Sequence, residues 1–276
     1  MLFRSAGFLL PADTAVAAGS DTPRKIERLW EITAPEGFSA PNLVQDPESG
    51  RTIGIAVSEV GGNLTFVKPD GNVAWRIELQ PPLLAAPAVC DLDTDGHTEL
   101  IAVDRAGRAV CANIDGDIQW EQQLPDGISG WGCPAAADIN GDGNAEVIIG
   151  DRLGNVSCLS HNGNLLWRFQ GEPGELGTPL VADMYDIPGK EIVITSHEQD
   201  IYALDCQGNR LWDIYIPNDL FPNSTPILAD LNGDGEASLF VGGGLNHVIR
   251  IDLQTAKVSD VFDTLQHINN AIVVGD

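Results

Sequence analysis

The sequence predicts an all-β propeller built from four-stranded antiparallel blades. Two periodic markers carry this prediction. One is a tryptophan that recurs every 45 to 47 residues, and the other is a proline with the same spacing. Both markers stay in phase along the chain, which indicates one repeated unit of about 45 residues. The tryptophans are Trp30, Trp75, Trp120, Trp167 and Trp212, and the prolines are Pro87, Pro134, Pro179 and Pro226.

Each repeat is expected to contain four short strands, here called strands A to D. In the repeat that starts at Pro87, strand A is the small apolar run 88–90, and strand B is the aliphatic run 100–103 after an acidic turn. Strand C is the alternating run 109–113, and a turn with Gly116 leads to strand D with Trp120. One small sheet cannot bury both faces alone, so we expect the tryptophans to pack between blades.

The repeats predict a single domain over residues 1–276, with units at about 39–84, 85–131, 132–176, 177–223 and 224–269. Residues 270–276 look like a strand A, and residues 1–33 would supply the other strands of the same blade, at 8–12, 14–19 and 26–32. This predicts six blades closed by both termini, which removes the open sheet edge. The alternative is a slice of a seven- or eight-bladed propeller.

The charge of the chain limits its partners. With 40 acidic and 15 basic residues the net charge is −25, and such a surface repels nucleic acid and anionic membranes. The apolar runs are shorter than the roughly 20 residues that a membrane-spanning helix needs. We therefore expect no nucleic-acid partner and no membrane insertion. The five cysteines include no Cys-x-x-Cys pair, and we expect them to be free rather than zinc ligands.

Two connections between strands A and B have a cation-binding pattern: the first loop (residues 91–99) and the second loop (residues 138–146). Both carry oxygen-bearing side chains at positions 1, 3 and 5, glycine at 6 and a carboxylate at 9, with a backbone carbonyl expected to turn inward at position 7. An all-oxygen shell rich in carboxylates favours calcium over zinc or magnesium. The alternative is that these residues form turns without metal. The candidate ligands are Asp91, Asp93, Asp95, His97 (carbonyl) and Glu99, and Asp138, Asn140, Asp142, Asn144 (carbonyl) and Glu146.

Two further loops depart from this pattern. The third loop (residues 230–238) ends in Ser238, which predicts a weaker site, and the degenerate loop (residues 183–191) carries Lys190, which would repel a cation. No nucleophile or general-base motif accompanies the loops, so a bound calcium is expected to be structural. The candidate ligands of the third loop are Asp230, Asn232, Asp234 and Glu236.

The acidic loops, set between a proline-led strand and an aliphatic strand, resemble the FG-GAP or VCBS repeats of integrin-α-like propellers. This resemblance implies calcium-stabilised propellers of extracellular or cell-envelope proteins, used in adhesion or beside carbohydrate-active domains. The glycine turn followed by tryptophan, as in residues 162–167, instead resembles PQQ-like, quinoprotein-type repeats. That likeness rests on packing residues, and no PQQ is expected. An extracellular or periplasmic location follows from the first resemblance, although residues 4–17 make no convincing signal peptide.

The face opposite the calcium loops is the predicted ligand face. Arg105, Arg152 and His197 follow strand B at equivalent positions of three consecutive repeats, which suits an anionic or sugar-acid ligand. Trp131 and Phe221 add aromatic side chains in the connections between strands D and A. The alternative is that each arginine pairs with the aspartate that precedes it.

These observations predict a non-catalytic, calcium-stabilised binding or scaffold module for a protein or carbohydrate ligand. Catalytic motifs such as a serine elbow, a phosphate loop or zinc spacing are not recognisable in the sequence. The alternative is a carbohydrate-active enzyme, or its accessory domain, that acts on acidic polysaccharide.

Overall fold

The computed structural model describes residues 30–80, 82–126, 132–216, 224–231, 233, 235–243 and 247–263. These residues form twenty strands and no helix. Among them there is therefore no helix long and apolar enough to cross a membrane. The strands expected at 8–12 and 14–19, and the one expected in 270–276, lie outside the described residues.

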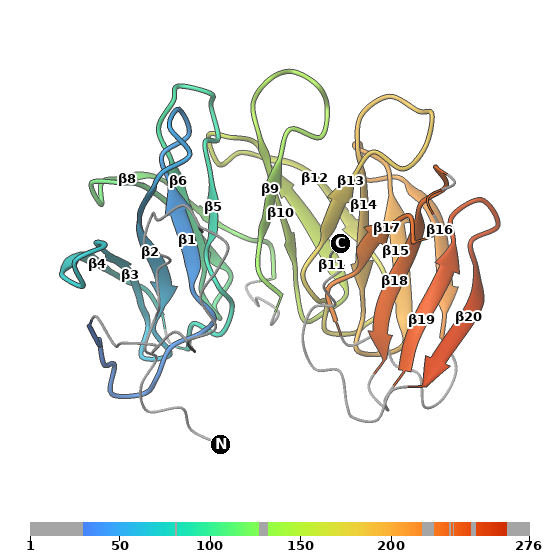
Figure 1. Cartoon of the computed structure of the whole chain (residues 1–276), viewed down its shortest axis with the longest axis horizontal. Helices are drawn as coiled ribbons and strands as arrows, with labels where there is room; N and C mark the ends of the chain where they lie inside the picture. Colours follow the sequence, from blue (N-terminus) through green and yellow to red (C-terminus); the bar gives the residue numbers. More distant parts are fainter. Residues whose placement is uncertain are drawn as a thin grey trace, which may run out of the picture.

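The strands form five antiparallel sheets of four strands, each in chain order (Figure 1). The sheets, here called blades 1 to 5, follow one another in an arc (Figure 1). Strands A, B and C of the second repeat are confirmed, because β5, β6 and β7 cover residues 88–90, 99–103 and 108–113. The bounds are β1 (Asn42–Gln45), β2 (Thr52–Ser58), β3 (Asn63–Val67) and β4 (Val73–Glu78) in blade 1; β5 (Ala88–Cys90), β6 (Glu99–Val103), β7 (Arg108–Asn113) and β8 (Ile118–Gln123) in blade 2; β9 (Ala135–Ala137), β10 (Glu146–Gly150), β11 (Asn155–Leu159) and β12 (Leu165–Gln170) in blade 3; β13 (Leu180–Ala182), β14 (Glu191–Thr195), β15 (Asp200–Leu204) and β16 (Arg210–Tyr215) in blade 4; and β17 (Ile227–Ala229), β18 (Ser238–Gly243), β19 (His247–Asp252) and β20 (Lys257–Asp263) in blade 5.

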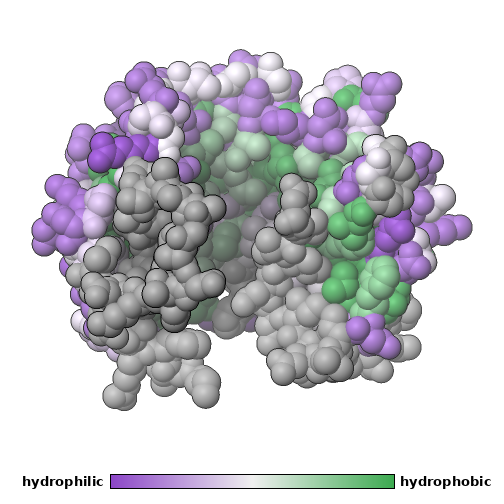
Figure 2. Space-filling view, viewed as in Figure 1, coloured by the Kyte–Doolittle hydropathy of each residue, from purple (hydrophilic) through white to green (hydrophobic). Residues whose placement is uncertain are grey.

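The blades pack face to face around their innermost strands. Strand β5 contacts both β1 and β9, and β9 contacts β13, so the A strands lie nearest to one another. Apolar clusters fill the space between neighbouring sheets, and one of them joins Ile101 of blade 2 to Val147 of blade 3. The D strands are the most exposed, and hydrophilic residues dominate the rim of the face seen in Figure 2. Each sheet falls within one predicted repeat, while closure by a sixth blade stays a prediction.

The periodic tryptophans pack between blades, as predicted. Trp120 Nε1 of blade 2 donates a hydrogen bond to His161 O of blade 3 at 2.8 Å. Gly163, with a φ of +82°, lies against the same indole, and a Cβ at this position would be 2.7 Å from a ring carbon. This turn therefore needs glycine both for its backbone and for the contact. The same contact joins Trp30 to Gly71, Trp75 to Gly116 and Trp167 to Gly208.

The interface between blades 4 and 5 is built differently. Trp212 Nε1 donates to the Tyr185 hydroxyl at 2.7 Å, and this hydroxyl donates to Leu253 O of blade 5 at 2.9 Å. The turn of blade 5 has Ala256 at positive φ where the other turns have glycine. Tyr185 occupies position 3 of the degenerate loop, so a side chain that would be a cation ligand elsewhere here bridges two blades.

Candidate metal centre

The first loop gathers carboxylates at the end of blade 2. It connects β5 to β6, and Glu99 is the first residue of β6. Ligand oxygens of Asp91, Asp93 and Glu99 all lie within 4.8 Å of one another. Asp91 Oδ2 accepts a hydrogen bond from Gly96 N, whereas Asp91 Oδ1 is buried and accepts none from the residues that the structure describes. Buried carboxylate oxygens without a donor are costly, so this arrangement fits a hard cation.

Glu99 anchors this loop. Its side chain is only 8% exposed, and its Oε2 accepts a hydrogen bond from Leu92 N at 2.9 Å. Burial, followed by the negative charges of Asp93, Asp95 and Asp91, raises the pKa of Glu99 to about 7. A divalent cation would relieve this repulsion and favour the ionised carboxylate.

The second loop is more fully hydrogen-bonded than the first. Both carboxylate oxygens of Asp138 accept backbone hydrogen bonds, from Gly141 N at 2.7 Å and Gly143 N at 3.0 Å. Asn140 Nδ2 donates to Glu146 Oε1 at 3.1 Å, so an amide group already contacts a candidate ligand oxygen. The sequence patterns of the two loops predict equal sites, but the geometry favours the first. The assignment of both loops to calcium stays a prediction.

The third loop resembles the second in its first residue. Asp230 accepts hydrogen bonds from Gly233 N and Gly235 N, both at 2.8 Å. Ser238, in place of the final glutamate, accepts a hydrogen bond from Arg250 Nε at 3.0 Å. Its ligand set stays a prediction, because two candidate ligands lie outside the described residues. These are Asn232 and Asp234.

The glutamate at position 9 has a role that sequence reasoning missed. It accepts a hydrogen bond from the backbone N–H of position 2 in three blades, including the degenerate loop, where Glu191 accepts from Met184 N at 2.6 Å. The signal was present in the sequence, because Glu191 persists although positions 3 and 5 of this loop have become Tyr185 and Ile187. This side chain therefore closes the loop whether or not a cation is bound.

Neighbouring loops are also joined to one another. Ala145 N of the second loop donates to Leu92 O of the first at 2.7 Å, and Lys190 N of the degenerate loop donates to Ile139 O of the second at 2.8 Å. A cation that orders one loop would therefore stabilise the adjoining blade as well.

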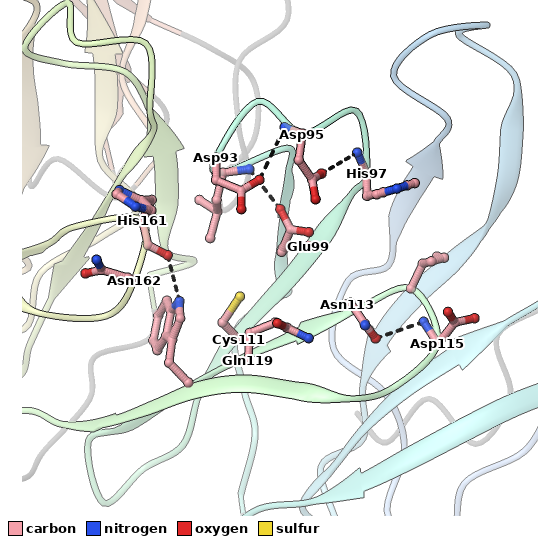
Figure 3. Close-up of a pocket in the computed structure, with 13 residues that line it drawn as sticks. Asp93, Asp95, His97, Glu99, Cys111, Asn113, Asp115, Gln119, His161 and Asn162 are labelled. Atoms are coloured by element: carbon pink, nitrogen blue, oxygen red, sulfur yellow. Dashed lines mark hydrogen bonds between the residues drawn. The ribbon is translucent and has the colours of Figure 1, made fainter.

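A pocket of about 340 Å³ lies beside the first loop, between blades 2 and 3. Figure 3 shows Asp93, Asp95 and Glu99 along one side of it. Asp115 lines it from the turn between β7 and β8, and His161 lines it from the corresponding turn of blade 3. This pocket lies on the face of the acidic loops, whereas the sequence analysis predicted a ligand on the opposite face.

Of the three side chains of the predicted cationic face, Arg105, Arg152 and His197, one is engaged in an ion pair. Arg152 Nε pairs with Glu175 Oε1 at 3.4 Å, and the backbone N–H of the exposed His197 donates to Glu175 O at 2.9 Å. Arg105 is exposed and forms no ion pair with a described residue. Trp131 and Phe221 lie outside the described residues.

The predicted pairing of each arginine with its preceding aspartate is wrong. Asp151 instead accepts hydrogen bonds from Asn155 and Arg168. Asp104 is fully buried and accepts the backbone N–H groups of Gln80 and Arg108. Both aspartates point inward because they hold the turn between strands B and C, which leaves the arginines outside.

Comparisons with known proteins agree with this architecture. Residues 91–149 match the model of an FG-GAP-like repeat, and residues 134–186 match the model of a lambda-carrageenase beta-propeller domain. No curated protein sequence matches the chain significantly. Each family match covers little more than one blade.

Solved structures with similar folds include BamB from Moraxella catarrhalis, at 16% identity and a TM-score of 0.55 over 82% of this chain and 64% of that one. Sqt1 from Saccharomyces cerevisiae is similar at 10% identity and a TM-score of 0.69, over 88% and 68% of the two chains. BBS1N in complex with ARL6DN is similar at 12% identity and a TM-score of 0.64, over 90% and 76%. The chain spans less than two thirds of BamB. At these identities the likeness shows the fold, that of a β-propeller repeat protein.

Proposed function

We propose that this β-propeller repeat protein is a non-catalytic binding or scaffold module whose blades are stabilised by calcium. The convergence of Asp91, Asp93 and Glu99, with the buried Asp91 Oδ1 lacking a donor, carries the calcium assignment. A match to an FG-GAP-like repeat over residues 91–149 supports it. The ion would hold the first loop to the second through the hydrogen bond from Ala145 N to Leu92 O, so its role is structural.

A protein is the favoured class of partner. The BBS1N structure, which has a similar fold, is a complex with another protein, ARL6DN. This supports the proposal that the present fold binds a protein. An extracellular or periplasmic location belongs to the same proposal, because calcium sites of extracellular modules work at about 10⁻⁴–10⁻³ M calcium.

Calcium is expected to raise the thermal stability of the chain. An ion that binds only the folded state, at one hundred times its Kd, adds about 2.7 kcal/mol to the free energy of unfolding. Melting curves in millimolar calcium and in excess chelator measure this difference. Asp93→Asn is expected to remove most of the shift, because it deletes one ligand charge of the first loop.

The matched control is Asp46→Asn, in the corresponding connection of blade 1. The carboxylate of Asp46 accepts hydrogen bonds from the backbone N–H and the hydroxyl of Ser49. This variant is expected to keep the full calcium-dependent shift. The same melting midpoint with and without the chelator would show that calcium does not stabilise the chain.

A second candidate function is binding or cleavage of an acidic polysaccharide. The match of residues 134–186 to a lambda-carrageenase propeller model favours it, as does the exposed Arg105, which forms no ion pair with the residues that the structure describes. The proposed module is expected to leave an acidic polysaccharide uncut. If it binds one, the triple variant Arg105→Ala/Arg152→Ala/His197→Ala is expected to weaken binding severalfold, because each cation near the ligand contributes roughly 0.2–1 kcal/mol.

Affinity electrophoresis in gels with sulfated and neutral polysaccharides measures the binding, and release of reducing ends measures cleavage. Arg210→Ala, which removes an exposed arginine from β16, is the matched control. Cleavage by the wild type that the triple variant loses would favour the enzyme over the scaffold.

A further inference from the structure

One face of blade 5 exposes apolar side chains whose counterparts in other blades are covered by the blade that follows. Leu92 and Ile139, at position 2 of the first and second loops, are each 1% exposed because the next blade packs on them. Leu231, at the same position of the third loop, is 62% exposed. Phe262 of β20 is 47% exposed, whereas Ile77, its counterpart in the register of blade 1, is 9% exposed and packs against blade 2. Blade 5 therefore presents the apolar face of an interface between blades.

The other end of the arc is covered by the first described residues. Trp30 Nε1 donates a hydrogen bond to Pro69 O at 3.0 Å, and its indole lies against Gly71 of blade 1. The tryptophans of blades 1 to 3 make the same contact with the blade that follows each of them. Ile32 joins an apolar cluster on this side of blade 1. Residues 30–32 therefore occupy on blade 1 the place that strand D of the preceding blade occupies elsewhere.

This packing indicates which segment covers blade 5. In Figure 1, blades 1 and 5 lie at the two ends of the arc. Because Trp30 takes the place of a preceding strand D, the residues before it are expected to form the unit between the two ends. Their sequence has apolar runs at 8–12 and 14–19, which suit strands that pack on an apolar face. A second copy fits less well, since its own residues 30–32 already cover the end of its blade 1 that would have to meet blade 5.

The joint between this unit and blade 5 is built without the tryptophan of the described joints between blades. In those joints a tryptophan Nε1 donates a hydrogen bond to the next loop or turn. At the corresponding register of β20 stands Asp260, which pairs with Arg250 at 3.5 Å. Ile26, four residues before Trp30, replaces the glycine that precedes each of the other periodic tryptophans by four residues. An exposed ion pair contributes less than a buried indole, so this joint is expected to be the weakest.

We propose that residues 1–29 pack on the face of blade 5 that carries Leu231 and Phe262, and that this seam is where the propeller opens first. Opening uncovers an apolar surface beside the Arg250–Asp260 pair, while the tryptophan contacts keep blades 1 to 5 together. The seam thus gives the propeller two arrangements, one with this surface covered and one with it free for a partner. This conformational role goes beyond the calcium-stabilised binding role proposed above.

Hydrogen–deuterium exchange of the full chain, followed by mass spectrometry, tests both parts of the proposal. Amides of residues 8–19 are expected to exchange more slowly than in an unstructured peptide but faster than those of β6 in blade 2. Exchange of residues 8–19 at the unstructured rate would overturn the packing, and exchange as slow as that of β6 would overturn the opening. Protection of residues 8–19 that rises with protein concentration would assign the contact to a second copy and also overturn the proposal.

Phe262→Ser is expected to speed the exchange of residues 8–19 about tenfold, because it removes an aromatic side chain on which they pack. Tyr215→Ser is the matched control, since Tyr215 is an exposed aromatic residue at the end of strand D in blade 4. Exchange in β6 is expected to stay unchanged in both variants, which verifies that the blades remain folded. Equal effects of the two variants, or no effect of Phe262→Ser, would contradict the location of the seam. Both variants should keep the calcium-dependent melting shift, so failure of the calcium site is visible separately.

Discussion

Replacing Trp120 with alanine is expected to lower the free energy of unfolding by about 3 kcal/mol, near the lower end for loss of a large aromatic side chain. The indole packs against the apolar cluster between blades 2 and 3, and its Nε1 donates to His161 O. Alanine would leave a space between the blades and an unused backbone acceptor. Chemical denaturation followed by circular dichroism measures the loss.

The contact with Gly163 gives this prediction an internal control. Gly163→Ala is expected to destabilise by itself, because the residue has a φ of +82° and its Cβ would lie 2.7 Å from the indole. In the Trp120→Ala background the steric part of that loss disappears and only the backbone strain of roughly 1 kcal/mol remains. Strictly additive losses in the double variant would mean that the two residues do not pack as described.

Glu99→Gln is expected to have opposite effects with and without calcium. In chelator above pH 7 the variant should be more stable than the wild type by about 2–3 kcal/mol. The reason is that glutamine is neutral, so no ionised carboxylate has to be buried beside the aspartates. In saturating calcium the order should reverse, since the variant lacks a ligand carboxylate. Melting curves of both proteins at pH 8, in chelator and in calcium, make the comparison.

The pH dependence of the wild type follows from the same group. Burial and the neighbouring aspartates raise the pKa of folded Glu99 from 4.5 to about 7, so the folded chain holds this proton more tightly than the unfolded chain. In chelator, the contribution of Glu99 is therefore greatest below about pH 4.5 and is lost as the pH rises to about 7. Calcium favours the ionised form of Glu99. In saturating calcium, the contribution of Glu99 to the pH dependence of the free energy of unfolding should therefore disappear.

Glu191→Gln is the matched control for Glu99→Gln. Glu191 closes the degenerate loop through Met184 N in the same way, but this loop has Tyr185 where the first loop has Asp93. Its substitution is expected to have the same effect in calcium and in chelator. A calcium-independent effect of Glu99→Gln as well would show that Glu99 acts only as a loop-closing acceptor.

The repeat and its strands were predictable from the sequence because their causes are local. Small apolar runs, β-branched runs and glycine turns have signatures within a few residues, and β5, β6 and β7 lie at the predicted places. The regular spacing of the tryptophans also predicted that they pack between blades. The acidic loops were found in the same way, since all their candidate ligands lie within nine residues.

Other features depend on residues that lie far apart in the sequence, and only the tertiary structure decided them. The pocket joins Asp93 to His161 of the next blade, and Tyr185 reaches Leu253. The first and second loops share one pattern, yet one oxygen of Asp91 accepts no hydrogen bond within the described part of the chain, while both oxygens of Asp138 accept backbone hydrogen bonds. The sequence by itself determined a repeated blade with acidic loops. The packed chain decided which carboxylates remain open to a cation, because that depends on which donors the surrounding backbone brings within reach.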